Sequence, residues 1–437
     1  MATPYTIHTS ILFDPKKKEW LNDMSVTVDP TTGCITKYFQ RTEDLGDCVP
    51  KNDIDLRGKY VLPGFVDAHT HIFLHSYQER ASLNQKRDES PTERIIRAVN
   101  HCRTALLSGF TTYRDLGSES MQNADAGVRD AINRGLTPGP RLFVATKVLA
   151  SSGAYESRTE NPGTCLPAAC HAIDGPEDAR RAVRERITQG ADIIKFYADY
   201  RRRIMRWPPV QQHPYIGGMK VPPAEPNPDV MVFDREEMDM IVRESTLAKA
   251  PVACHAKTYE GVKMAVEAGA LTIEHGYYVN DEILTIMKEK GTILIPTLAI
   301  AERLHADIMT GVVIPALQLA HKRGVRLAVG GDTGTYPHGQ GIREAEIMIE
   351  AGLPLEDVLE SCSVGGWEAC GGDLCGMRFG WFEEGLRADL IAFIEDPRKN
   401  YKAMRRVDFV MKDATVWKQN SQAVGMVEHH HKWDAEK

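Results

Sequence analysis

Eight short apolar segments, each followed by a longer stretch with a helical pattern, constrain the fold of this chain most strongly. They span residues 61–71, 109–117, 140–146, 191–198, 250–256, 271–276, 292–298 and 326–332. Strand-like segments that alternate with helices are typical of βα units, whose strands pair in parallel. Eight such units over about 270 residues suit a (β/α)8 barrel, also called a TIM barrel. We therefore predict an α/β protein of this class.

The helical stretches carry recognisable end signals. Four of them cover residues 90–108, 175–190, 234–249 and 280–291. Several open with Ser, Asp or Asn near a Glu, which is the pattern of a helix N-cap, and close on Gly, which commonly ends a helix. We expect a helix in each stretch.

The two ends of the chain have a different pattern. Residues 5–60 contain short strand-like runs separated by turn-forming clusters such as DPKKK and DPTTG, and strand character returns at residues 387–395 and 408–418. We expect the second β region to complete the first. The predicted units are a small β domain of residues 1–60 and 375–420, a catalytic barrel of residues 61–374, and a loose tail of residues 421–437.

Charge and cysteine usage restrict the partners and the compartment. The 53 Lys and Arg residues against 60 Asp and Glu residues leave a net charge of -7, without the basic field that attracts nucleic acid. No stretch approaches the roughly 18 apolar residues of a membrane span, and the first residues lack a signal-peptide pattern. The nine cysteines are scattered, which favours reduced thiols. We expect a cytoplasmic protein that acts on a small molecule and binds neither nucleic acid nor a membrane.

Side chains of the ligand type lie in or at the ends of five predicted strands. Residues at the carboxyl ends of barrel strands converge on one face, and a His-x-His pair on a strand points both imidazoles to the same side. One such pair is weak evidence. A single strand-end histidine could equally be a buried residue hydrogen-bonded to a backbone carbonyl, and a single aspartate could be a helix N-cap. Together the residues predict a metal site. They are His69, His71, Lys195, His255, His275 and Asp332.

Lys195 is the most informative of these residues. Ile193, Ile194, Phe196 and Tyr197 flank it in a predicted buried strand. A charged, unpaired lysine there would cost several kcal/mol, so this lysine must be paired, neutralised or modified. A neutral amine can react with carbon dioxide to form a carbamate, which would offer two oxygens to two cations. The alternative is a salt bridge to a neighbouring carboxylate.

The segments that carry these residues resemble the amidohydrolase superfamily. They are VLPGFVDAHTH, IIKFY, CHA, IEHG and GGDTG, bracketed by β regions of which the second begins at GLRADLIAF. The chain is most similar to the imidazolonepropionase-related metal-dependent hydrolases, which include Xaa-Pro dipeptidase-like and ochratoxinase-like enzymes. The resemblance extends from about residue 5 to residue 418. It implies a metal-bearing (β/α)8 barrel with a small β-sandwich domain built from both chain ends.

The resemblance also implies a binuclear centre and a reaction. Two divalent metal ions, with zinc as the expected metal, would share a hydroxide and be bridged by a carbamate on Lys195. Asp332 would be the catalytic proton shuttle, and the substrate bond would be the C–N bond of a carboxamide in a dipeptide or an N-acyl amino acid. His69, His71 and Asp332 would hold one ion, and His255 and His275 the other.

Three alternative functions remain open at this level. The same hydroxide could open a lactone or a cyclic amide. A one-metal deaminase on the same fold would use the histidines and the aspartate without the carbamate. A non-catalytic scaffold on this barrel would have lost ligands, whereas all six positions here hold suitable residue types.

Residues 199–232, which are rich in Pro and Arg and follow the fourth strand, are expected to select the substrate. Loops after barrel strands overhang the active face, and guanidinium groups bind carboxylates in a bidentate manner. The alternative is a solvated charge run. The segment after Lys195 differs from the Ser-Gly-Gly type that ochratoxinase-like relatives tend to carry there, so the resemblance does not identify the substrate. We leave a homo-oligomer open. The predicted substrate-binding residues are Tyr197, Arg201, Arg202, Arg203, Arg206 and His338.

Overall fold

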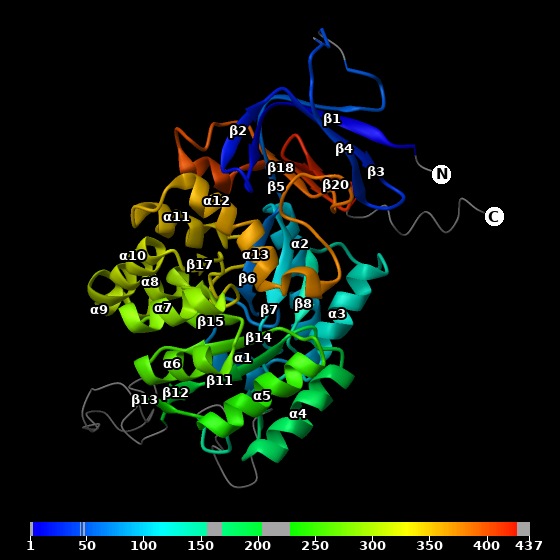
Figure 1. Ribbon diagram of the computed structural model, residues 1–437. Coiled ribbons are helices and arrows are strands. Elements are labelled where there is room, and N and C mark those ends of the chain that lie inside the picture. Colours follow the sequence, from blue (N-terminus) through cyan, green and yellow to red (C-terminus); the bar gives the residue numbers. More distant parts are fainter. Residues whose placement is uncertain (1–2, 44, 47–48, 155–167, 203–227, 426–437) are drawn as a thin grey trace, which may run out of the picture.

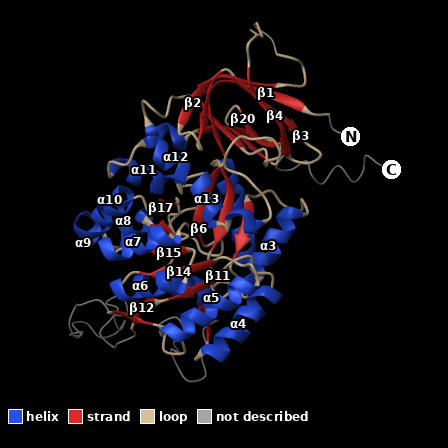
Figure 2. Ribbon diagram, viewed as in Figure 1, coloured by secondary structure: helices blue, strands red, loops and turns tan. Residues whose placement is uncertain are grey.

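The computed structural model describes residues 3–43, 45–46, 49–154, 168–202 and 228–425. It shows a mixed α/β protein in which strands from both chain ends lie above a body of parallel strands and helices (Figures 1 and 2). Among the described residues, no helix combines the length and the apolar character needed to cross a membrane.

The lower body contains two sheets of parallel strands. One has seven strands in the order β10-β9-β11-β14-β15-β16-β17, and the other has the order β6-β7-β8. Each of the eight apolar segments contains one parallel strand, which confirms the predicted strands. These are β6 (Phe65–Thr70), β7 (Phe110–Asp115), β8 (Arg141–Val144), β11 (Ile194–Tyr197), β14 (Val252–Ala256), β15 (Thr272–His275), β16 (Ile293–Ile295) and β17 (Arg326–Leu327).

Backbone hydrogen bonds join the two parallel sheets at two places. The amides of Asp192 and Ile193, which precede β11, donate to the carbonyl of Val144 in β8 at 2.8 and 3.2 Å. On the other side, Ala68 in β6 donates to the Val329 carbonyl, which follows β17, at 2.8 Å. These bonds connect β8 with the residues before β11, and β6 with the segment after β17.

Helices flank the parallel strands, and their ends follow the predicted capping chemistry. The Ser90 hydroxyl accepts from the amide of Glu93, and Asp234 and Glu237 form a reciprocal capping box. Gly291 ends its helix in the left-handed conformation, at φ 70°. The helices are α1 (Ser82–Asp88), α2 (Pro91–Leu107), α3 (Ala124–Asn133), α4 (Pro176–Thr188), α5 (Arg235–Leu247), α6 (Tyr259–Ala268), α7 (Asp281–Lys290), α8 (Leu298–Leu304), α9 (Ala306–Ile308), α10 (Ile314–Arg323), α11 (Ile342–Glu350), α12 (Leu355–Ser361) and α13 (Val364–Ala369).

The upper sheet combines strands from both ends of the chain. Its order is β21-β20-β19-β18-β5-β1-β3-β4, with β2 paired to β1. The two ends meet where β5 pairs antiparallel with β18, and the sheet has an apolar core of its own. Its strands are β1 (Tyr5–Asp14), β2 (Glu19–Asn22), β3 (Met24–Asp29), β4 (Cys34–Gln40), β5 (Ile54–Pro63), β18 (Leu390–Phe393), β19 (Val407–Lys412), β20 (Thr415–Gln419) and β21 (Gln422–Ala423).

Two predicted irregular regions contain strands. The tail was predicted to be loose from residue 421, but β21 pairs with β20, because its backbone groups complete the edge of the sheet. Residues 426–437 lie outside the described residues. The Pro- and Arg-rich segment begins with β12 (Asp199–Arg201) and ends at β13 (Asp229–Met231), which pair antiparallel as a ribbon. The remaining strands are β9 (Val148–Ala150) and β10 (Cys170–Ala172).

Candidate metal centre

The six predicted ligands line one cavity at the carboxyl ends of the parallel strands. The cavity has a volume of about 780 Å³. Its remaining wall comes from the ribbon β12–β13, from helices α1, α8 and α9, and from segments that follow the strands. The arrangement therefore brings together residues that are as far apart as His69 and Asp332 in the sequence. The six residues are His69, His71, Lys195, His255, His275 and Asp332.

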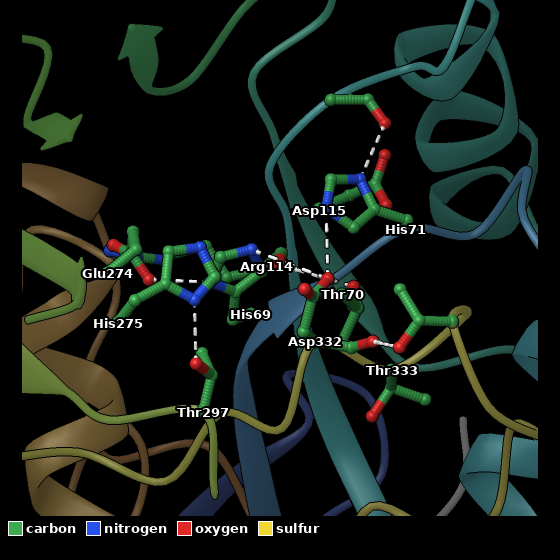
Figure 3. Close-up of polar contacts among 12 residues, drawn as sticks. His69, Thr70, His71, Arg114, Asp115, Glu274, His275, Thr297, Asp332 and Thr333 are labelled. Carbon is green, nitrogen blue, oxygen red and sulfur yellow. Dashed lines mark hydrogen bonds and ion pairs between the residues drawn. The ribbon is translucent and has the colours of Figure 1, made fainter. Parts of the chain in front are cut away.

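His69, His71 and Asp332 form the tightest group of ligand atoms. Their candidate ligand atoms all lie within 4.8 Å of one another. The Nε2 atoms of His69 and His71 are 3.7 and 3.3 Å from Oδ1 of Asp332, and Figure 3 shows these side chains turned toward one another. The geometry matches the His-x-His prediction, because both imidazoles of β6 point to the same side.

A second pair of imidazoles lies beside this group. The ring centroids of His255 and His275 are 4.4 Å apart in an edge-on arrangement, and His275 is 5.4 Å from the ring of His69. Nδ1 of His275 is hydrogen-bonded to the hydroxyl of Thr297 at 2.7 Å, which leaves its Nε2 as the atom available to a cation. Four histidines from β6, β14 and β15 thus surround the centre.

Lys195 extends into the same cavity from β11. Lys195 is only 3% exposed, and burial lowers the pKa of its ammonium group to about 8. Within the described part of the chain, Nζ has no hydrogen-bond partner, and the nearby carboxylates of Glu274 and Asp332 offset only part of the effect of burial.

The polar atoms left without partners fit a divalent cation. Counting only described residues, Nζ of Lys195 and Nε2 of His255 are buried and have no hydrogen-bond partner, while Oδ1 of Asp332 faces only the two imidazole nitrogens of His69 and His71. Buried polar atoms are normally satisfied, so two unpartnered atoms in one cavity require an explanation. Imidazole nitrogens and carboxylate oxygens are the donors that zinc and similar ions take. The donor set therefore suits a metal.

The ionisation of the cluster points in the same direction. Burial, reinforced by neighbouring positive groups, lowers the pKa values of His255 and His275 well below the usual range, so these imidazoles are neutral, as metal ligands must be. Burial alone would raise the pKa of Asp332, but His69 and His71 hold it below its usual value. The pKa of His71 rises to about 9 despite burial, because Asp332 and Glu119 favour its charged form. In the metal-free protein His71 therefore carries the positive charge next to Asp332, and it would release its proton on binding a cation.

Strained backbone marks the strand ends that carry this cluster. His275, Thr297 and Asp332 have φ values of 75°, 49° and 62°, in the left-handed region that favours glycine. Such conformations cluster at functional sites, where the surrounding structure maintains them. No sequence pattern identified these positions as strained.

The structure places only some of the predicted substrate-binding residues at the cavity. Tyr197 and Arg201 line the cavity. Arg202 is exposed and does not line it, although its amide donates to the carbonyl of Pro228 in the ribbon region. Arg203 and Arg206 lie outside the described residues.

His338 lies apart from the cavity. Its ring stacks on His101 with centroids 4.2 Å apart, and its Nε2 is hydrogen-bonded to the carbonyl of Leu74 at 3.1 Å. It is not among the described residues that line the cavity. The structure therefore gives His338 a packing position in place of the predicted substrate contact, because the turn after Asp332 directs it toward α2.

Several cavity residues were not predicted from the sequence. Lys86 on α1 and Glu119 after β7 form an ion pair at 2.5 Å in the wall, and Lys257 follows β14 two residues after His255. His305, between α8 and α9, also lines the cavity. Position just beyond a strand end was the available signal for Glu119 and Lys257. The sequence offered none for Lys86 or His305.

The fold has parallel strands flanked by helices, and a cluster of metal-ligating side chains lies at the carboxyl ends of these strands. These features define an enzyme of the metal-site α/β class. The chain belongs to the amidohydrolase family, whose sequence profile matches residues 60–417. This finding confirms the predicted family. Family membership supports hydrolysis as the activity, with amide bonds as the class of bond, and divalent metals are general in the family.

Similar proteins agree with this assignment. The ochratoxinase of Aspergillus niger is 28% identical over 399 residues, which cover 82% of this chain and 74% of that protein. The structure of an Xaa-Pro dipeptidase with bound methionine superposes with a TM-score of 0.76 at 27% identity, covering 95% of this chain and all of that one. A prolidase complexed with N-methylphosphonate-L-proline gives 0.77 at 26%, with the same coverage. The neighbours imply a TIM barrel with an additional domain.

Proposed function

We propose that this protein is a binuclear metal-dependent hydrolase that cleaves the carboxamide C–N bond of a dipeptide or an N-acyl amino acid. The observation that carries the proposal is the convergence of four imidazoles, a buried lysine and a carboxylate on one cavity. We propose zinc as the metal. We further propose that the hydrogen bonds from β8 to β11 and from β6 to the segment after β17 close the strands into a (β/α)8 barrel, with the upper sheet folded as a small β-sandwich.

Two metal ions need more ligands than one tetrahedral site. A single structural zinc site uses about four ligands, and the cavity offers six suitable side chains. Lys195 supports the second ion, because its buried Nζ lacks a partner among the described residues and a carbamate there would offer two oxygens. In the proposal, His69, His71 and Asp332 would hold one ion, His255 and His275 would hold the other, and a carbamate on Lys195 would supply oxygen ligands.

Divalent ions at such a site supply an acidified water nucleophile and polarise the scissile carbonyl. Asp332 is the proton acceptor in our proposal. Asp332 lines the cavity beside both imidazoles of the His-x-His pair, so its carboxylate can take a proton there and pass it to the leaving nitrogen. The neighbouring histidines, which hold its pKa low, keep it ionised before the reaction.

The cavity wall supports a substrate with one charged and one apolar end. Arg201 and Lys257 contribute cationic groups on the side of the ribbon, while Ile300, Leu304 and Ile308 from α8 and α9 contribute apolar surface. A dipeptide or an N-acyl amino acid combines a carboxylate with an apolar group. The names of the similar dipeptidase, prolidase and ochratoxinase support this substrate class.

The test combines metal analysis with a substrate screen. The purified chain, loaded with Zn²⁺, should contain close to two equivalents by elemental analysis and hydrolyse members of a panel of dipeptides and N-acyl amino acids. His255→Ala should lose metal and activity together. His321→Ala is the matched control, because this histidine pairs with Asp357 at 2.8 Å and does not line the cavity.

The alternatives predict different results in the same screen. Turnover of lactones or cyclic amides without turnover of the linear amides would establish the second hydrolytic function. One firm equivalent of metal in fully active protein would replace the binuclear centre with a deaminase-like one. A chain that binds no metal and hydrolyses nothing in the panel would be a scaffold.

A further inference from the structure

A buried network of polar side chains lies behind the metal-facing side of His69 (Figure 3). Nδ1 of His69 is 2.8 Å from Oε2 of Glu274, and neither side chain is more than 2% exposed. Arg114 pairs with the other carboxylate oxygen, Oε1, through one of its guanidinium nitrogens. The three residues come from β6, β15 and β7, so the network spans the interior between strands.

The orientation of Glu274 is fixed by donors. Oε1 receives both the Arg114 guanidinium and the hydroxyl of Thr272, the latter at 2.5 Å. Arg114 is held in turn by the carbonyls of Ala68 and Ala369, at 2.6 and 2.7 Å. Oε2 is thereby left to His69. A carboxylate paired with Arg114 only accepts hydrogen bonds, so the Nδ1 atom of His69 must carry the proton.

We propose that Glu274, anchored by Arg114, is a positioning residue that sets the tautomer of His69 and thereby the affinity of the centre for metal. With the proton on Nδ1, the lone pair lies on Nε2, which faces Oδ1 of Asp332 at 3.7 Å. Partners behind a metal-ligating histidine commonly orient the ring and raise its basicity. This inference rests on the metal site of the proposed function.

The substitution Glu274→Gln separates tautomer control from simple packing. Gln has nearly the same shape, but one of its two terminal atoms is an NH₂ donor. Arg114 and Thr272 both donate toward the Oε1 position, so the amide oxygen must face them and the NH₂ must face His69. Nδ1 of His69 then has to accept, its proton moves to Nε2, and the ligand lone pair is lost.

The chain contains a matched control. Glu89 forms the same kind of buried pair with His75, whose Nε2 lies 2.8 Å from Oε1 of Glu89, and neither residue lines the cavity. Glu89→Gln therefore removes an equivalent carboxylate–histidine contact without touching the centre. A general loss of packing would affect both variants, whereas a change in the tautomer of His69 would appear only in Glu274→Gln.

Nuclear magnetic resonance of the full chain labelled with ¹⁵N-histidine and freed of metal provides the direct test. His69, assigned by the signals that disappear in His69→Gln, should carry its proton on Nδ1 in the wild type and in Glu89→Gln, and on Nε2 in Glu274→Gln. A proton on Nε2 in the wild type would overturn the proposal. Because that measurement uses the wild type alone, it decides the question even if Glu274→Gln fails to fold.

Competition with a chelator for Zn²⁺ gives the second readout. Glu274→Gln should bind Zn²⁺ on the order of 10 to 100 times more weakly, the usual cost of losing a partner behind a ligand, and Glu89→Gln should match the wild type. Unchanged affinity in folded Glu274→Gln would also overturn the proposal. A wild type that binds no Zn²⁺ would refute the proposed function, and the tautomer measurement in metal-free protein would still report on Glu274.

Discussion

Replacing Lys195 with methionine should make the metal-free protein more stable. Methionine has a similar length and carries no charge, so it keeps most of the packing in β11. The ammonium of Lys195 is 3% exposed and its Nζ has no hydrogen-bond partner among the described residues. Burial therefore disfavours the charged form, which is why the pKa falls from its usual 10.5 to about 8.

The magnitude follows from linkage between proton binding and folding. At pH 7 the lysine is protonated in both the folded and the unfolded states, and the lowered pKa costs the folded state about 3 kcal/mol. Between pH 8 and 10.5 the folded state has released its proton while the unfolded state still holds one. The wild type therefore gains stability as the pH rises through this window. At pH 10 the remaining cost is about 1 kcal/mol.

Urea unfolding of both proteins at pH 7 and at pH 10 measures the effect. The buffers should contain a chelator and no bicarbonate, so that neither a metal ion nor a carbamate compensates the charge. Lys195→Met should be the more stable protein at pH 7, and its advantage should shrink at pH 10. A variant that is less stable than the wild type at pH 7, or an advantage independent of pH, would refute the reasoning. With metal present, the same variant should lose the second ion and its activity.

Three further substitutions test other parts of the structure. Asp332→Asn should lower kcat by roughly 10²- to 10⁴-fold in an amide-hydrolysis assay, because the proton acceptor is lost; activity near that of the wild type would contradict this role. Arg201→Ala should raise KM for a substrate with a free carboxylate more than KM for its neutral amide. Arg202 does not line the cavity, so Arg202→Ala should change neither KM value. Equal effects of the two substitutions would mean that Arg201 is a solvated charge without a role in binding. Arg141→Met leaves buried Asp389 without its ion-pair partner, so it should lower the free energy of unfolding in urea by about 3 to 5 kcal/mol. A decrease of less than about 1 kcal/mol would contradict this expectation.

The sequence predicted those features that depend on local chemistry and on strand direction. Apolar runs that alternate with helical stretches located the parallel strands, and capping residues such as Ser90, Asp234 and Gly291 marked helix ends. Strand ends converge in any parallel α/β body, so residues at those ends could be assigned to one cavity without knowing any distance. For this reason the structure brings all six predicted ligands together.

What the sequence missed depends on how elements pack across the chain. Lys86 reaches the cavity because α1 lies over the strand ends, and no local pattern encodes that placement. The same limit explains His338, which lies only six residues beyond Asp332 yet stacks on His101 of α2. Glu274 is a further case, because a charged residue inside a buried strand is understood only when Arg114 appears opposite it.

The features that suit the cavity to cations also oppose folding in their absence. His275 and Asp332 hold left-handed backbone conformations, which cost of order 1 to 3 kcal/mol each. Lys195 adds the cost of its buried charge, and Nε2 of His255 has no hydrogen-bond partner among the described residues. A ligand that binds only the folded state contributes stability according to its concentration relative to Kd, about 4 kcal/mol at a thousandfold excess. Metal loading should therefore raise the melting temperature of the wild type markedly and that of Lys195→Met by less. An equal rise in both proteins would mean that the lysine takes no part in holding the metal.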